Sequence, residues 1–471
     1  MSTVLAILFS SALGRTLGAA DFGLYFMLVS FSTFAYVVID WGQQVYVTRE
    51  AARRPERGSV LLGTVLVLRI SGAALEAVLS GLAVRALGYD AMTCWLTIAF
   101  IIVSLPFFLA QTYGTVFRAR DRMGLDACVS VANKIALLLL ALLALALHGG
   151  IPSVLAVQAL AGVLALAFAA RLYRRVTTSR LRYSSQIASE LMVSGAVLLT
   201  ANIACNIQTY IDAVVLSKLV PADAMGWYGA AKNIMGTMTM PALILAAASF
   251  PALSRAAADK EAFKAAVRTA LRPILWLGAL AATGAYLFAD DAIAIIYGQQ
   301  HFAPSGIILK VYAPAFLLLF LNTLLLYALF ALHRARAFAA VKLGSVAVST
   351  ALELALIPAF QQRVGNGGIG VVAAFVAGEF VVTAGALYLM RQSLGLDMAL
   401  NMAQALGSAA LTLLLLRSMP PLPFLTGVSV CVIVFSFCSV GLGLVRRSDL
   451  ELFRALLRKN QSAPESSASS W

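Results

Sequence analysis

The sequence predicts an all-α polytopic membrane protein with about fourteen transmembrane helices: two six-helix lobes followed by two extra C-terminal helices. Hydrophobic residues make up 61% of its 471 residues and charged residues 12%, about half the charged share of a soluble domain. The apolar runs are about twenty residues long and rich in Leu, Ala and Val, the length that a helix needs to cross a bilayer. Transmembrane barrel strands are about half as long, so a barrel is excluded.

An internal duplication predicts the two lobes. The stretch GRTLGAADFGLY (14–25) returns about 200 residues later as SKLVPADAMGWY (217–228). Gly23 is matched by Gly226, and in each copy a cation ends one apolar run shortly before the next run begins. A lone match of this kind is also typical of any short turn between two membrane helices, so further landmarks are needed.

Two weaker landmarks support the duplication. The segment VTREA (47–51) is echoed by LSRAA (253–257), and the basic turn RARDR (118–122) by HRAR (333–336). The spacing between matched positions grows by 11 residues, from 203 between Gly23 and Gly226 to 214 between Arg122 and Arg336. We therefore expect an insertion in the second copy, and the polar segment 289–306 is the candidate, as an external excursion.

Positive charge gives the orientation. The net charge is +14, and the cations fall in alternate loops, which indicates topology and not nucleic-acid binding. Fourteen helices place both termini in the cytoplasm. The expected division is an N-terminal lobe (1–185), a C-terminal lobe (186–395), two extra helices (396–446) and a cytoplasmic tail (447–471). The first run, 1–17, is short for a span, which leaves open a start further upstream.

Catalytic and metal-binding motifs are missing from the sequence. It has no phosphate-binding loop, nucleophile elbow or HExxH motif, so we expect neither an enzyme nor a cofactor. The five cysteines lie within apolar runs without a CxxC pair, and there are three histidines, so neither a disulfide framework nor a zinc site is expected. If the protein transports, an ion gradient must drive it.

Ionisable residues inside predicted helices are the candidate coupling or cavity groups, because such residues are costly against lipid and face a cavity or a partner. They are Asp40, Arg69, Glu76, Lys134, Asp212, Lys232, Glu353 and Glu379. Arg69 and Glu76 lie on one face of a helix. There they could form an internal ion pair or line a polar cavity. Lys232 could pair locally with Asp212. Glu353 and Glu379 suit either a proton or cation role or helix packing through a buried hydrogen bond.

The motifs RxLGxxDFGxY (15–25), DWG (40–42) and REA (49–51) resemble, in this order, the N-terminal signature of Wzx-like polysaccharide export flippases. These belong to the multidrug/oligosaccharidyl-lipid/polysaccharide exporter superfamily. Further matches are YID (210–212) and FPALSR (250–255), and the resemblance extends over about residues 1–440. It implies two lobes related by a pseudo-twofold axis along the membrane normal, around a central cavity that opens alternately to each side.

The resemblance also implies a substrate, a polyprenyl-diphosphate-linked oligosaccharide that crosses the bacterial inner (cytoplasmic) membrane for surface polysaccharide biosynthesis, such as O-antigen or exopolysaccharide. The implied partners are this lipid, a coupling ion (H⁺ or Na⁺), membrane lipids and polysaccharide polymerases or glycosyltransferases, without nucleic acid. Cations expected to hold the diphosphate are Arg15, Arg49, Lys218, Lys232 and Arg255. The alternative for these cations is that they snorkel to the interface or obey the positive-inside rule.

Two other functions stay open at this point. The first is a drug/cation antiporter of the multidrug and toxic compound extrusion branch, which shares the fold but needs an acidic site for organic cations. The first run, 1–17, holds no carboxylate and contributes Arg15 instead. The second is a non-transporting membrane scaffold for glycosyltransferases, which would tolerate loss of the helix-embedded charges.

Overall fold

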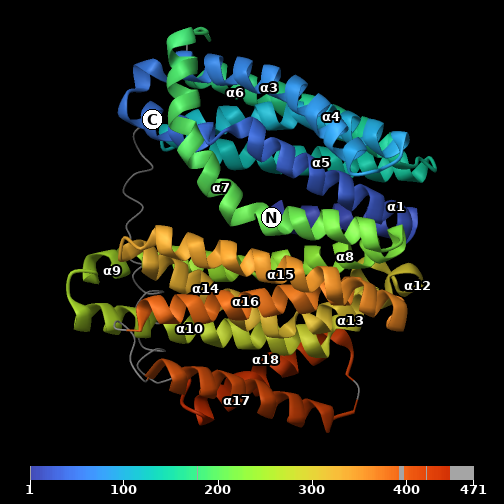
Figure 1. Ribbon diagram of the computed structural model, residues 1–471, viewed down its shortest axis with the longest axis vertical. Helices are drawn as coiled ribbons and strands as arrows, with labels where there is room; N and C mark the ends of the chain where they lie inside the picture. Colours follow the sequence, from blue (N-terminus) through green and yellow to red (C-terminus); the bar gives the residue numbers. More distant parts are fainter. Residues whose placement is uncertain (1, 178, 392–396, 421, 446–471) are drawn as a thin grey trace, which may run out of the picture. The chain divides into compact units, whose positions relative to one another are not determined.

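The computed structural model describes residues 2–177, 179–391, 397–420 and 422–445. Within these ranges the chain consists of helices joined by turns, without a β-strand (Figure 1). Among the residues that the structure describes, twelve helices are long and apolar enough to cross a membrane. The predicted fold class, an all-α polytopic membrane protein, is confirmed.

The first half contains eight helices and one 3₁₀ turn. These are α1 (Ser2–Asp40), α2 (Gln43–Arg53), the 3₁₀ turn (Pro55–Arg57), α3 (Gly58–Ala86), α4 (Ala91–Ala119), α5 (Met123–Ala146), α6 (Ile151–Val176), α7 (Ser185–Leu219) and α8 (Ala222–Met238). The second half continues with α9 (Met240–Ala256), α10 (Lys260–Leu287), α11 (Ala289–Tyr297), α12 (Gln299–Phe302), α13 (Pro304–Val311), α14 (Ala313–Ala331), α15 (Ala335–Val364), α16 (Gly368–Met390), α17 (Asp397–Arg417) and α18 (Phe424–Gly441).

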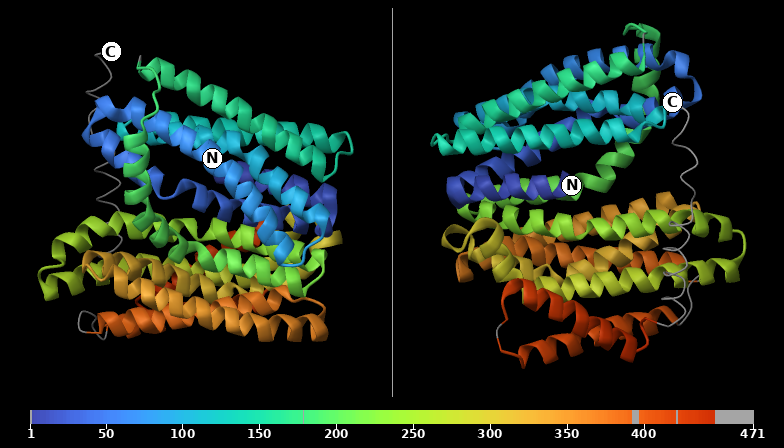
Figure 2. Two further views of the ribbon diagram at one scale, coloured as in Figure 1. Left: turned by 45° about the horizontal axis from the view of Figure 1, so that its top comes forward. Right: turned by 180° about the vertical axis from the view of Figure 1, so that it is seen from behind.

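Helix α1 contains two membrane helices, because its backbone reverses direction at Gly18 (Figure 2). Gly18 has φ 78° and ψ 179°, which a residue with a side chain rarely adopts. In an unbroken helix Phe9 and Tyr25 would lie about 24 Å apart, yet their ring centroids are 6.1 Å apart. The twelve spans of the described residues count α1 once and leave out the 35-residue α7. With α1 counted as two spans and α7 added, the total is the predicted fourteen.

Several helices extend beyond the apolar runs of the sequence. Helix α6 continues through the basic residues after Arg171 to Val176, and α7 begins at Ser185, before its apolar run. The segment 254–268 is mostly helical, because α10 begins at Lys260 with the carboxylate of Asp259 accepting the backbone N–H of Glu261 over 3.0 Å. Sequence hydropathy misses these ends because a helix continues in polar sequence beyond the bilayer.

The helices gather into two compact units. Unit 1 comprises Met1–Thr237, Ala292–Ile308 and Lys342–Phe375, and unit 2 comprises Met238–Asp291, Leu309–Val341 and Val376–Trp471. The lobe boundaries expected near residues 185 and 395 come from the internal repeat, whereas the two units reflect contacts between helices. The lobe boundaries therefore stay a prediction. The membrane orientation also stays a prediction.

In unit 1, helices α3, α4, α5 and α6 form a bundle whose core includes Leu62, Tyr113, Phe117, Ala165 and Tyr173. Small residues permit the close approach of α4 and α6: a Cβ added to Gly162 would lie 3.0 Å from the backbone nitrogen of Phe107. Helix α1 packs on α3, α4 and α5. The bundle therefore provides a fixed wall opposite α1.

The expected insertion 289–306 forms short helices, and its residues from Ala292 onward belong to unit 1. They pack on the first part of α1. The hydroxyls of Tyr297 and Ser10 lie 2.8 Å apart, and Nδ2 of Asn233 donates to Ser10 over 3.0 Å. Gly14 makes room for the rings of Tyr297 and Phe302. The insertion thus holds the first membrane helix in place.

Unit 2 has its own core around α10, in which α9, α14, α16, α17 and α18 also take part. Buried residues of this core include Leu253, Phe263, Phe320, Leu325 and Phe435. The two C-terminal helices, α17 and α18, pack on each other and on α10 (Figure 1). The pair predicted as an addition to the two lobes is therefore attached to unit 2.

Candidate functional site

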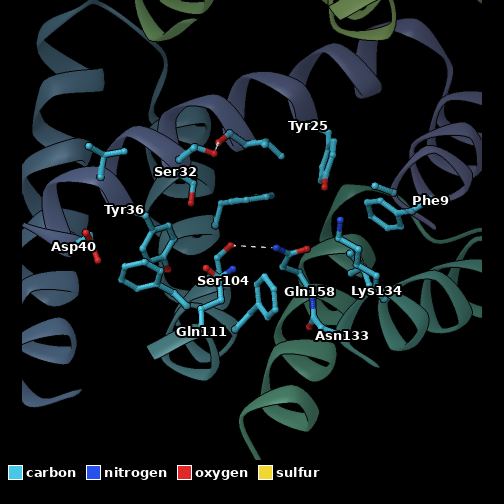
Figure 3. Close-up of a pocket in the computed structure, with 18 of the residues that line it drawn as sticks. Phe9, Tyr25, Ser32, Tyr36, Asp40, Ser104, Gln111, Asn133, Lys134 and Gln158 are labelled. Carbon is cyan, nitrogen blue, oxygen red and sulfur yellow. Dashed lines mark hydrogen bonds between the residues drawn. The ribbon is translucent and has the colours of Figure 1, made fainter. Parts of the chain in front are cut away.

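Unit 1 has a partly open pocket of about 500 Å³ between α1 and the bundle of α4, α5 and α6 (Figure 3). This volume is in the range of natural ligand sites. The lining residues are Leu5, Ala6, Phe9, Tyr25, Val29, Ser32, Thr33, Tyr36, Val37, Asp40, Gln44, Phe100, Ser104, Phe107, Phe108, Gln111, Asn133, Lys134, Leu137 and Gln158.

The second part of α1 supplies one wall. Its lining residues recur every three or four positions from Tyr25 to Asp40, which is one face of a helix. Figure 3 shows Tyr25, Ser32, Tyr36 and Asp40 along this face. The hydroxyl of Tyr36 donates to the carbonyl of Ile101, in the turn of α4 that precedes Pro106. The wall therefore combines aromatic rings with hydroxyl groups.

The opposite wall carries amide side chains from three helices: Gln111 from α4, Asn133 from α5 and Gln158 from α6 (Figure 3). Nε2 of Gln158 donates to Oγ of Ser104 over 3.4 Å. The ammonium of Lys134 is the positive charge among the lining residues. The site residues predicted from the sequence are all charged and do not include these amides, although three amides within membrane helices are themselves a signal.

The acid of the pocket, Asp40, is already neutralised. The guanidinium of Arg69, which is 1% exposed, donates to the Asp40 carboxylate and to the hydroxyl of Thr112 over 2.6 Å. It also lies 4.3 Å from the ring centroid of Phe108. The ion pair that sequence spacing allowed between Arg69 and Glu76 is not formed, because Glu76 accepts from Ser80 over 3.0 Å. Asp40 therefore leaves the pocket without an available negative charge.

A second polar cluster in unit 1 joins Asp212, Tyr228, Lys232 and Glu353. Nζ of Lys232 lies 3.4 Å from Oδ2 of Asp212 and 2.8 Å from the hydroxyl of Tyr228, which donates to Asp212 over 3.3 Å. The local pair expected between Asp212 and Lys232 is confirmed. Glu353 is fully buried and within electrostatic reach of both. Lys232 thus pairs with Asp212, while both carboxylate oxygens of Glu353 are buried without a hydrogen-bond partner.

Glu379, in unit 2, lies in a hydrogen-bond network with neutral polar side chains. Nδ2 of Asn322 donates to its carboxylate over 2.7 Å, and the hydroxyl of Thr383 donates to Oδ1 of Asn322 over 2.8 Å. All three side chains are buried. This network joins α14 to α16 and matches the packing role that the sequence left open for Glu379.

The cations expected to hold a diphosphate contact different elements. Arg15 donates through Nε to the carbonyl of Ile296 over 3.0 Å and through Nη2 to Ile295, near the end of α11. The ammonium of Lys218 lies 3.3 Å from the ring centroid of Tyr89. Arg49 on α2 and Arg255 on α9 are exposed, and Lys232 belongs to the buried cluster. Their diphosphate role stays a prediction.

A family model described as "Polysaccharide biosynthesis protein" matches residues 1–257, more than half of the chain. The chain belongs to the polysaccharide biosynthesis protein family. This confirms the resemblance found in the N-terminal motifs. No curated protein is significantly similar to the chain.

Solved structures with this fold are membrane transporters. The chain of a lipid II flippase, MurJ, in an inward closed conformation superposes with a TM-score of 0.75 at 13% identity, covering 93% of this chain and 96% of that one. A multidrug resistance MATE family transporter in an inward-facing conformation gives 0.67 at 15% identity, over 83% and 95%. A Pyrococcus furiosus transporter of the same superfamily gives 0.56 at 15%, over 83% and 93%. At these identities the likeness shows the fold alone.

Proposed function

We propose that this family member is a flippase that moves a polyprenyl-diphosphate-linked oligosaccharide across the bacterial cytoplasmic membrane for surface polysaccharide biosynthesis. The family assignment supports the saccharide pathway. The fold shared with a lipid II flippase supports movement of a lipid-linked head group. The lipid tail would stay in the bilayer while the polar head group crosses through the protein by alternating access.

The chemistry of the unit 1 pocket is the observation that carries this proposal. Its amides and hydroxyls suit a saccharide, and Lys134 suits an anionic group. Its acid, Asp40, is paired with Arg69. An anionic or neutral polar head group is therefore accommodated better than a cation.

Ion coupling is proposed for the cluster of Asp212, Lys232 and Glu353. One ammonium balances one of the two buried carboxylates, so the second carboxylate favours uptake of a proton or another cation. Binding and release of that ion during the cycle would reset the protein. Arg15, Lys218, Arg49 and Arg255 are proposed as contacts of the diphosphate before and after its passage.

A drug/cation antiporter is the second candidate. The fold of a MATE transporter and the two buried carboxylates of the same cluster favour it. The pairing of Asp40 with Arg69 argues against an antiporter, because an organic cation needs an available acid in the pocket. An antiporter also has no need for an amide wall.

A deletion strain separates the two candidates. If the flippase proposal holds, lipid-linked oligosaccharide accumulates on the cytoplasmic face of the deletion strain, as measured by its inaccessibility to an external probe, and the wild-type gene restores access. An unchanged lipid-linked pool together with reduced efflux of cationic dyes would instead establish the antiporter. An unchanged pool with unchanged efflux would favour a scaffold.

A further inference from the structure

The polar wall of the unit 1 pocket holds acceptor atoms that the protein leaves unused. Asn133 is 7% exposed, and its Oδ1 is buried without a hydrogen-bond partner. Oε1 of Gln158 is likewise buried and unpartnered. Buried acceptors without a donor cost free energy, so a ligand that brings donors gains affinity there. Saccharides bring such donors as hydroxyls and acetamido N–H groups.

Aromatic rings line both sides of the pocket. Phe9, Tyr25 and Tyr36 lie on the α1 side (Figure 3), and Phe100, Phe107 and Phe108 come from α4. A pyranose ring has an apolar C–H surface, which packs on aromatic rings, and a polar rim. The pocket therefore offers each surface of a sugar ring a matching surface, as ligand sites with a few placed polar groups do.

Lys134 adds an anion site to the sugar site. It follows Asn133 directly in sequence and stands near the middle of α5 (Met123–Ala146). A charge at such a depth in a membrane protein is costly and marks a pathway for a charged substrate. Its ammonium is a point charge with three donors, suited to phosphate or carboxylate oxygens.

Resting on the flippase function proposed above, we propose that this pocket seats one pyranose ring of the substrate together with an anionic group attached to it. Asn133 and Gln158 accept from the ring substituents, and Lys134 binds the anion. Two sources supply this chemistry: the phosphate that joins the first sugar to the lipid, or the carboxylate of a uronic acid in the oligosaccharide. The pocket is then the site at which the protein recognises its saccharide.

Binding of small probes to the purified full-length protein tests this. The probes are N-acetylglucosamine 1-phosphate, glucuronate, neutral N-acetylglucosamine and inorganic phosphate, measured by titration calorimetry. We expect one of the two anionic sugars to bind about tenfold more tightly than both the neutral sugar and inorganic phosphate. A tenfold difference in affinity corresponds to the free energy of one charge-assisted hydrogen bond. Preference for the sugar phosphate assigns the lipid-proximal sugar, and preference for glucuronate assigns a uronic acid.

Variants locate the site. Lys134→Met should remove the advantage over the neutral sugar, and Lys134→Arg should keep most of it. Asn133→Leu with Gln158→Leu should remove the advantage over inorganic phosphate. Lys264→Met is the matched control, because Lys264 lies in unit 2, paired with Glu261 over 2.7 Å. Equal thermal unfolding of variant and wild type shows that each variant is folded.

The proposal is overturned if neither anionic sugar binds better than inorganic phosphate, or if Lys134→Met binds like the wild type. The flippase function is judged separately, by the lipid-linked pool of the deletion strain. Full rescue of that strain by the Lys134→Met and Asn133→Leu/Gln158→Leu variants would refute the pocket assignment and leave the flippase function standing. Absence of any lipid-linked accumulation would refute the function itself.

Discussion

Gly23 and Gly226 pack against each other in a symmetric contact. A Cβ added to Gly23 would meet the carbonyl oxygen of Ala222, four residues before Gly226. A Cβ added to Gly226 would meet the carbonyl oxygen of Ala19, four residues before Gly23. The two positions matched by the internal repeat therefore face one another through the same atoms, as a local twofold axis requires. Glycine is needed at both, because backbone atoms occupy the space of any side chain.

The first prediction concerns this contact. Gly23→Ala and Gly226→Ala should each lower the stability of the protein by about 1–3 kcal/mol, because the two helices must separate to admit a methyl group. Thermal unfolding of the purified protein measures this. Gly124→Ala is the control, since a Cβ there would meet nothing within 4 Å. Equal stability of Gly23→Ala and Gly124→Ala would contradict the contact.

The second prediction concerns the buried pair of Asp40 and Arg69. Asp40→Asn should destabilise the protein by about 3–5 kcal/mol, because it leaves the guanidinium of Arg69 without its counter-charge. The double variant Asp40→Asn/Arg69→Met should recover much of this loss. A double-mutant cycle from unfolding curves measures the coupling. Purely additive effects of the two substitutions would show that the residues are not coupled.

The third prediction concerns pH and the start of α7. The hydroxyl of Tyr46 donates to the carboxylate of Glu190, which also binds Arg57 over 3.2 Å, and these contacts lower the pKa of Glu190 below its ordinary value of 4.5. The stability that Glu190 provides is therefore complete above pH 4.5 and is lost as pH falls through the lowered pKa. The melting temperature at neutral pH should fall in Glu190→Gln.

The pH series supplies the control for Glu190. Wild type and Glu190→Gln should converge as pH drops below 4.5, because the wild-type carboxyl is then protonated. A difference between them that stays constant from pH 7 to below pH 4 would mean that the charge of Glu190 is not what stabilises this junction.

The fourth prediction concerns Glu353. Glu353→Gln should remove most of the acceleration that an imposed ion gradient gives to flipping, because the neutral amide takes up no ion, while slow flipping without a gradient persists. Fluorescent lipid-linked substrate in proteoliposomes, with and without a pH or sodium gradient, measures this. Glu261→Gln, at an exposed carboxylate of unit 2, is the control. A Glu353→Gln protein that still responds fully to both gradients would remove Glu353 from coupling.

The fifth prediction concerns the exposed cations. Arg15→Ala combined with Arg49→Ala should abolish export of surface polysaccharide in a complemented deletion strain at unchanged membrane abundance. Arg15→Lys should retain more activity than Arg15→Ala, because a lysine keeps the charge but not the bidentate geometry. Since Arg15 also donates to the carbonyls of Ile295 and Ile296, unfolding temperatures must be compared. Full export by the double variant would show that the two arginines do not handle the diphosphate.

Part of the site could be read from the sequence. Buried ionisable residues are visible because charge within an apolar run is rare, and Asp40, Lys134 and Glu353 all occupy polar surroundings. The amides were missed because Asn133 and Gln158 carry no charge and lie on different helices. They become candidate site residues only because they converge with Gln111 around one pocket.

The sequence by itself determined the membrane class, the helices and the repeat. These depend on local composition, because the transfer of an apolar run into the bilayer is decided within that run. The tertiary structure alone decided that Arg69 pairs with Asp40 and not with Glu76, and that Asn133 and Gln158 line one pocket. Such choices depend on which helix faces become neighbours, and that is set by packing between segments far apart in the chain.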